Sequence, residues 1–112
     1  MKVFENESLI VTNGLFRNLR VIDKRNGRTI KPDADLGHKC LEVWMKLSKF
    51  RYHTPQAKRL AEAHMFSAFG NLCLNPADPI AVTFHLSPDY IAQEFARRGE
   101  ISALSLEMDE LD

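Results

Sequence analysis

The segment from Thr54 to Cys73 constrains the fold more than any other part of the chain. Thr54 is a residue type that caps helices, and the following Pro55 suits a first helical turn. Apolar residues then recur at helical spacing along one face, and Phe66, Phe69 and Cys73 add a second apolar face. A helix that is apolar on two sides is expected to be covered on two sides. The segment therefore predicts a central helix with other elements packed against both of its faces.

Composition predicts one soluble globular domain spanning residues 1–112. Hydrophobic residues make up 45% of the chain and charged residues 27%, which is ordinary for a folded protein. No apolar run approaches the ~20 residues that a membrane span needs, and the first eight residues lack the apolar core of a signal peptide. Cys40 and Cys73 fall in helical patterns rather than in a disulfide framework. We therefore expect a cytoplasmic protein that does not associate with membranes.

The first thirty residues consist of short β-prone runs separated by turn signals. Asn-Gly dipeptides occupy positions 13–14 and 26–27. An Asn-Gly pair between β-prone flanks is typical of a type I′ hairpin turn, because both central residues of that turn need a positive φ. The second dipeptide lets Val21 pair with Ile30 across the turn. The region therefore predicts an antiparallel meander of three or four strands.

The rest of the chain predicts helices with one further strand. Leu36–Tyr52 carries one apolar stripe and joins the central helix by a short link, which favours an antiparallel helical pair. Ile80–Leu86 alternates and is predicted to be a strand, and Ser87-Pro88 starts a helix that Gly99 is suited to end. The acidic segment 100–112 fits helix or strand, with helix favoured. The predicted fold class is α+β: an N-terminal antiparallel β-meander packed on an antiparallel helical pair, followed by a strand, a helix and an acidic C-terminal element.

The zero net charge of the chain conceals a strong polarity. Residues 1–60 carry 13 Lys and Arg against 6 Asp and Glu, a balance of +7, whereas residues 61–112 carry 2 against 9, a balance of −7. Such asymmetry favours either a polyanionic partner for the first half or a basic partner for the second. It is equally typical of halves that form ion pairs with each other inside one chain. Complementary halves also permit a homodimer.

Cations concentrated in the second predicted hairpin favour contact with nucleic-acid phosphates. The leading hypothesis is a small non-enzymatic regulator that binds DNA or RNA through this hairpin and the adjoining helix starts. The same cations are typical of a solvated hairpin that protects an edge strand. The predicted contact residues are Arg17, Arg20, Lys24, Arg25, Arg28, Lys31, Lys46, Lys49, Arg51, Lys58 and Arg59.

The acidic C-terminal half favours an alternative hypothesis, a protein-interaction module such as an inhibitor, an adaptor or an antitoxin-like protein. Leucines and a methionine alternate with carboxylates there, as in a helix that docks in the groove of a basic partner. The competing interpretation is a terminal element packed on its own domain. The predicted partner-binding residues are Leu104, Glu107, Met108, Glu110 and Leu111.

No motif in the sequence indicates catalysis, a cofactor or a metal. His38, Cys40, His64 and Cys73 are residue types that bind zinc, but no C-x2-C or H-x3-H pair sets them at ligand spacing. The sequence also lacks a G-x-S-x-G nucleophile motif and a phosphate-binding glycine loop. We therefore predict no catalytic residue, no cofactor and no metal ligand.

Overall fold

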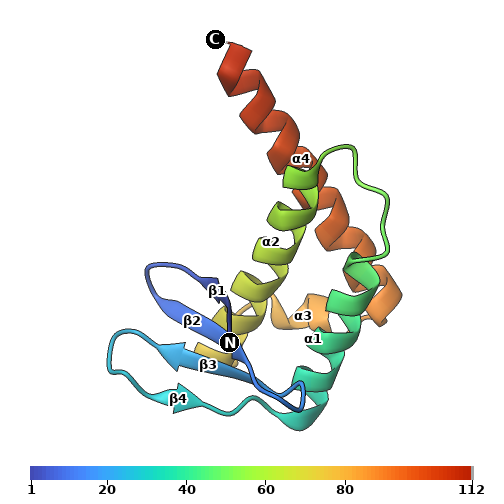
Figure 1. Cartoon of the computed structure of the whole chain (residues 1–112). Helices are drawn as coiled ribbons and strands as arrows, with labels where there is room; N and C mark the ends of the chain where they lie inside the picture. Colours follow the sequence, from blue (N-terminus) through green and yellow to red (C-terminus); the bar gives the residue numbers. More distant parts are fainter. Residues whose placement is uncertain (112) are drawn as a thin grey trace.

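The chain folds into an N-terminal antiparallel sheet packed against a group of helices, as the computed structural model shows (Figure 1). The structure describes the backbone of residues 1–111 and the side chains of residues 1–109. The predicted α+β class is confirmed. The strands are β1 (Lys2–Glu5), β2 (Leu9–Asn13), β3 (Leu19–Asp23) and β4 (Thr29–Ile30), and the helices are α1 (Ala34–Leu47), α2 (Pro55–Leu74), α3 (Ala81–Phe84) and α4 (Pro88–Leu111).

The predicted meander is confirmed, since the strands lie in the order β1-β2-β3-β4 and Val21 pairs with Ile30. The predicted turn type is wrong at both dipeptides. Gly27 has φ 72°, but its amide donates to the Asp23 carbonyl oxygen at 2.8 Å in a longer connection than a two-residue turn. In the β2–β3 loop, residues 14–18, the positive φ belongs to Arg17 at 54°. Loop length therefore decided the turn geometry at both places.

Helix α2 lies at the centre of the molecule, covered on two sides as predicted. Its Thr54 hydroxyl accepts a hydrogen bond from the Ala57 amide at 3.2 Å, which confirms the predicted cap. On one side Gly70 faces the sheet so closely that a Cβ there would lie 2.8 Å from the Leu9 side chain. Helix α1 runs antiparallel to α2 (Figure 1), and the Trp44 ring meets Phe66 edge-on at 4.9 Å. None of the helices in the described part of the chain is both long and apolar enough to cross a bilayer.

Helix α4 covers the other side of α2 and corrects the expected role of Gly99. Gly99 does not end a helix but lies inside α4. A Cβ at Gly99 would lie 2.7 Å from both the backbone nitrogen and the Cβ of Ala61. The glycine is therefore required for close contact between two helices, and α4 continues through the acidic segment as the favoured helix.

The strand predicted over Ile80–Leu86 is wrong, because this segment forms the short helix α3 and flanking turns. Asp78 starts the turn: its carboxylate accepts from the Ile80 amide and its carbonyl oxygen accepts from the Ala81 amide. Phe84 is buried, whereas Val82 is exposed, so the alternating residues do not share a face. A short apolar run between prolines fits either structure, and periodicity alone does not separate the two.

Candidate functional site

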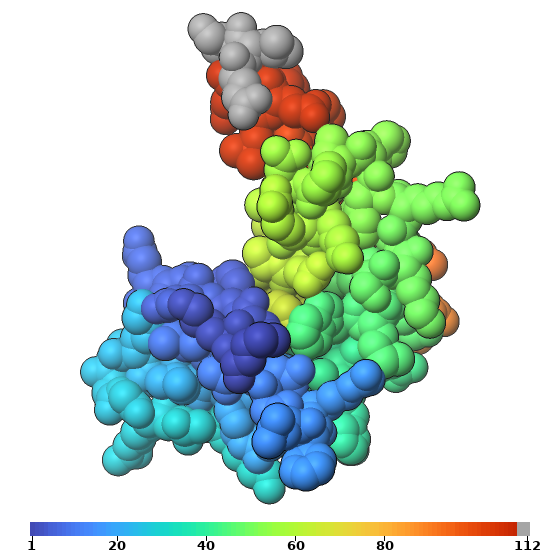
Figure 2. Space-filling view, in the orientation of Figure 1, coloured from blue at the N-terminus to red at the C-terminus, as the bar shows by residue number. Residues whose placement is uncertain are grey.

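The last turns of α4 extend past the start of α2 and have no element of the described chain packed around them (Figure 1). Figure 2 shows the described part of this helix end projecting beyond the green region at the start of α2. Ala103 is still buried against the fold. Beyond it, Leu104 is 58% exposed, Leu106 50% and Met108 61%. Apolar side chains so exposed on a helix end are typical of a docking element.

Two of these side chains lie on one side of α4 together with the exposed Ile101. Ile101, Leu104 and Met108 follow the i, i+3, i+7 spacing of a single helical stripe, and all three are exposed. Leu106 points about 160° away from Leu104 and Met108, because each residue turns about 100°. Leu111 continues the stripe in the sequence, but the side chains of Leu111 and Glu110 lie outside the described residues.

A cleft runs beside this stripe, where α4 passes the connection between α1 and α2. Its volume is about 380 Å³. We name it the α4 cleft; it is lined by His53, Thr54, Glu100, Ile101, Ala103, Leu104 and Glu107. Two of the predicted partner-binding residues, Leu104 and Glu107, are thus brought together, and exposed Met108 follows on the next turn. Apolar walls with a carboxylate rim suit a segment that presents apolar and basic side chains.

Glu100 fixes one wall of the α4 cleft. Its Oε1 accepts a hydrogen bond from the His53 backbone amide at 2.9 Å, and its Oε2 lies 2.9 Å from His53 Nδ1. The bond from the His53 amide, with the His53 ring as a further cause, lowers the pKa of the Glu100 carboxyl. The carboxylate therefore remains charged at neutral pH and holds the α1–α2 connection against α4.

The eleven cations predicted to bind nucleic acid divide into several groups. Arg17, Arg20 and Lys31 line one shallow cavity with exposed Phe16, which we name the Phe16 cavity. The turn between β3 and β4 carries Lys24, Arg25 and Arg28 at the opposite end of β3. From Arg20 to Lys24 the chain advances four residues at about 3.3 Å each, or about 13 Å.

Some of these cations form ion pairs with carboxylates of the same chain. Lys24 lies 2.8 Å from Glu5, Arg25 lies 2.9 Å from Asp23, and Lys46 lies 2.8 Å from Asp89. The Arg25 side chain and amide both donate to the Asp23 carboxylate, which organises the turn and lowers the pKa of that carboxyl. Lys49, Arg51, Lys58 and Arg59 form no ion pair within residues 1–109.

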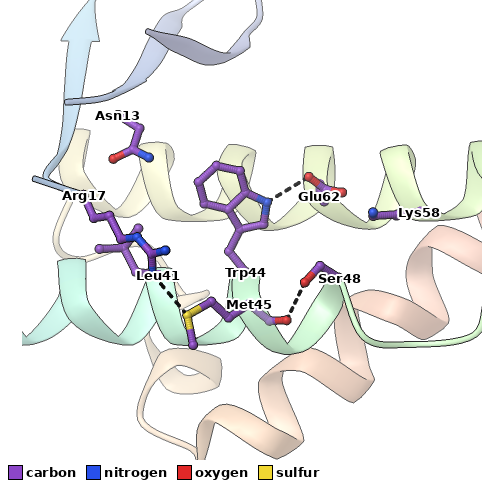
Figure 3. A pocket seen from close by; sticks show the side chains of 8 residues that line it. All are labelled: Asn13, Arg17, Leu41, Trp44, Met45, Ser48, Lys58 and Glu62. Atoms are coloured by element: carbon purple, nitrogen blue, oxygen red, sulfur yellow. Dashed lines mark hydrogen bonds between the residues drawn. The ribbon is translucent and has the colours of Figure 1, made fainter. Parts of the chain in front are cut away.

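A larger hollow of about 460 Å³ adjoins the Phe16 cavity, with Arg17 and Leu41 lining both. We name it the Trp44 groove; its lining residues, shown in Figure 3, are Asn13, Arg17, Leu41, Trp44, Met45, Ser48, Lys58 and Glu62. The Trp44 indole N–H donates to the Glu62 carboxylate at 2.9 Å, and the Arg17 guanidinium lies 3.6 Å from the Met45 sulfur. The groove thus has an aromatic and aliphatic floor with cations from the β2–β3 loop and α2.

The β2–β3 loop presents two apolar side chains to solvent, and one of them, Phe16, lines the cavity that adjoins the Trp44 groove. Leu15 is 98% exposed and Phe16 91% exposed. Sequence reasoning did not single out Leu15, and it assigned Trp44 to a buried stripe although Trp44 also lines the groove. The signal available in the sequence was an adjacent apolar pair directly after a turn dipeptide, where polar residues are expected.

Of the residues considered for metal binding or nucleophilic chemistry, Cys40 is buried and His64 and Cys73 are half-buried, whereas His38 is exposed. Burial raises the pKa of the Cys40 thiol, and burial raises the pKa of the Cys73 thiol to about 12, so few thiolates form at neutral pH. His64 Nε2 lies 2.8 Å from the Ser102 hydroxyl and links α2 to α4. Among the side chains that the structure describes, no three ligating groups converge on one point.

Comparison of the chain with protein-family models, with curated proteins and with solved structures finds no match.

Proposed function

We propose that the protein is an interaction module that docks a basic amphipathic segment of a partner protein through the end of α4. The observation that carries this proposal is the exposed stripe of Ile101, Leu104 and Met108, which lies where α4 reaches and passes the start of α2. Helices commonly dock through such i, i+3, i+7 anchors.

The charge of the helix end specifies the chemistry of the partner. Residues 100–112 contain five carboxylates and no Lys or Arg. Glu100 and Glu107 stand at the rim of the α4 cleft. A partner helix with apolar residues on one side and lysines or arginines beside them matches both features. Carboxylates at the rim chiefly raise the association rate and select the partner, while the apolar anchors supply most of the affinity.

A defined peptide tests this proposal. The probe is a fluorescent helical peptide of leucine and lysine heptads, and the control peptide has the same composition in an order that scatters the leucines around the helix. We expect the first peptide to bind the protein with micromolar affinity. Substituting both Leu104→Ala and Met108→Ala weakens that binding at least about tenfold, because two buried anchors are lost.

Leu106→Ala is the matched control, since Leu106 is equally apolar and exposed but points to another side of α4. It leaves peptide affinity near that of the unmodified protein. Equal loss of affinity in the Leu106 variant and the double variant, or equal binding of the two peptides, contradicts docking through the stripe.

Contact with single-stranded nucleic acid is a second candidate function, favoured by one observation. Phe16 is almost fully exposed and lines a cavity together with Arg17, Arg20 and Lys31. An exposed ring beside several cations is the arrangement on which single-stranded bases stack while phosphates meet the cations.

Fluorescence anisotropy with a single-stranded oligonucleotide at low ionic strength tests this candidate. Phe16→Ala and Arg20→Glu each weaken binding, whereas Arg28→Glu at the other end of β3 changes it little. A protein that fails to bind the oligonucleotide at low ionic strength excludes the candidate. If the Arg20 and Arg28 substitutions weaken binding equally, the oligonucleotide is held by nonspecific charge attraction and not by a site at Phe16.

A further inference from the structure

The two surfaces described above have opposite charge and matching apolar centres. We propose that the Trp44 groove of one molecule receives the end of α4 of a second copy, so that the protein associates head to tail. This inference rests on the proposed function in that the end of α4 is the docking element, and it names a partner for that element. It also assigns a role to the Trp44 groove.

The floor of the groove suits the apolar stripe of α4. Leu41, Trp44 and Met45 line a hollow of about 460 Å³, which lies in the usual range for binding sites. Met45, which also lines the hollow, is half-exposed, so part of its side chain is open to contact with a docked helix. The hollow has room for the side chains of Leu104 and Met108 from another molecule.

The cations of the groove match the carboxylates of α4. Neither Arg17 nor Lys58 forms an ion pair among the residues that the structure describes. The one carboxylate in the groove, that of Glu62, is held by the Trp44 indole. Glu107 and Asp109 on the end of α4 have no cation on their own helix after Gly99 and supply the missing anions.

One exposed apolar side chain lies in the cavity next to the groove. Phe16 is 91% exposed and lines the Phe16 cavity, which shares Arg17 and Leu41 with the Trp44 groove. Its ring would pack along a helix that docks in the groove.

The contact must form between molecules. Helix α4 is held on α2 by the close approach of Gly99 to Ala61, and from there it continues away from the sheet (Figure 1). Its end therefore does not fold back to its own groove. A contact between two different surfaces is heterologous, so repeated docking produces a ring or an open chain.

Two variants that each lose one surface test this arrangement. The groove variant carries Arg17→Glu and Lys58→Glu, and the helix variant carries Leu104→Glu and Met108→Glu; all four side chains are exposed, so the fold is retained. In sedimentation velocity at low ionic strength, the unmodified protein shows association that grows with concentration. Each variant alone sediments as a monomer. Their mixture forms a one-to-one dimer and nothing larger, because only one functional groove and one functional helix end remain.

A charge exchange supplies an independent check. A variant with Glu107→Lys and Asp109→Lys loses self-association. Mixing it with the groove variant restores assemblies larger than a dimer, because the acidic helix end meets the basic groove and the lysine helix end meets the glutamate groove. Unmodified protein that stays monomeric at the highest attainable concentration overturns the inference. So does a mixture of complementary variants that forms no dimer.

The outcome also separates this inference from the proposed function. A monomeric protein that binds the leucine-lysine peptide through Leu104 and Met108 contradicts self-association and leaves the docking function standing. A monomeric protein that binds neither peptide nor itself contradicts both. A third outcome is a protein that does not dimerise but binds an oligonucleotide, with that binding lost in Trp44→Ala. This outcome assigns the groove to nucleic acid instead.

Discussion

The two halves of α4 carry the same kind of apolar pattern and meet opposite environments. In the first half, Ile91, Ala92 and Phe95 are fully buried. In the second half, Leu104 and Met108 are more than half exposed, although their spacing along the helix is equally regular. The difference arises because α2 begins at Pro55, so α2 covers α4 only as far as Ser102 and Ala103, and the last turns of α4 extend past the start of α2. Helical periodicity thus identifies the apolar side of a helix but does not say which molecule covers it.

Substitutions in the two halves of α4 should differ most in how far they lower the free energy of unfolding. Phe95 is fully buried, packs against Phe84 at 6.1 Å between ring centroids and carries the Arg98 guanidinium 5.4 Å above its ring. Phe95→Ala should lower the free energy of unfolding by about 3–5 kcal/mol, since it leaves a cavity in the core. Urea unfolding followed by circular dichroism measures this change. A loss below about 1 kcal/mol would mean that the first half is not core.

Glycine substitutions sharpen the comparison where the two helices cross. Gly99→Ala forces a Cβ against the Ala61 backbone, and it should destabilise the protein by about 1–3 kcal/mol despite the better helix propensity of alanine. At Gly37 in α1, a Cβ would meet no other atom within 4 Å. Gly37→Ala should therefore stabilise by up to about 1 kcal/mol. Stabilisation by both substitutions would contradict a close crossing at Gly99.

A smaller effect, dependent on pH, is expected where the α1–α2 connection meets the second half of α4. The pKa of Glu100 is lowered from its ordinary value of 4.5 in the folded protein, chiefly by the hydrogen bond from the His53 amide. Its contribution to stability is therefore fully present above that ordinary value and is lost as pH falls through the lower folded pKa. The stability difference between the protein and its Glu100→Gln variant should be constant near neutral pH and shrink in acid. A difference that grows in acid would contradict the assigned contact.

The smallest expected effects are those of the exposed stripe itself. Leu104→Ala and Met108→Ala should each change the free energy of unfolding by no more than about 0.5 kcal/mol, because both side chains are already in solvent. The same urea titration used for Phe95→Ala provides the measurement. A loss of about 2 kcal/mol or more would assign the stripe to the core of this chain.

Signals confined to a few neighbouring residues were sufficient to predict much of the fold. Thr54 and Pro55 mark the start of α2, and the apolar residues on two faces of that helix indicated that it would be covered twice. The turn dipeptides located the hairpins, although the positive φ at Arg17 depended on the length of the loop. The spacing of Ile101, Leu104 and Met108 favoured a helix for the acidic segment but also left a strand open, and the structure has a helix there.

Features that depend on distant parts of the chain were not predictable in this way. Gly99 has the local signature of a helix end, and only its contact with Ala61 on α2 explains why the helix continues. The Trp44 groove brings together residues from β2, the β2–β3 loop, α1 and α2, so no sequence window contains it. The ion pair between Lys46 and Asp89 was likewise not predictable, because the two residues lie far apart in the sequence.

One shortened protein tests most directly whether the end of α4 is a docking element rather than part of the core. A chain that stops at Ser105 keeps buried Ala103 and the Ser102–His64 contact but loses Met108. Thermal unfolding and binding of the leucine-lysine peptide are measured on the same preparation. We predict a melting temperature within about 2 °C of the full chain, since about 1 kcal/mol corresponds to roughly 4 °C for a domain of this size, together with loss of peptide binding. A melting temperature lowered by about 8 °C or more, or peptide binding that survives the truncation, would contradict this account.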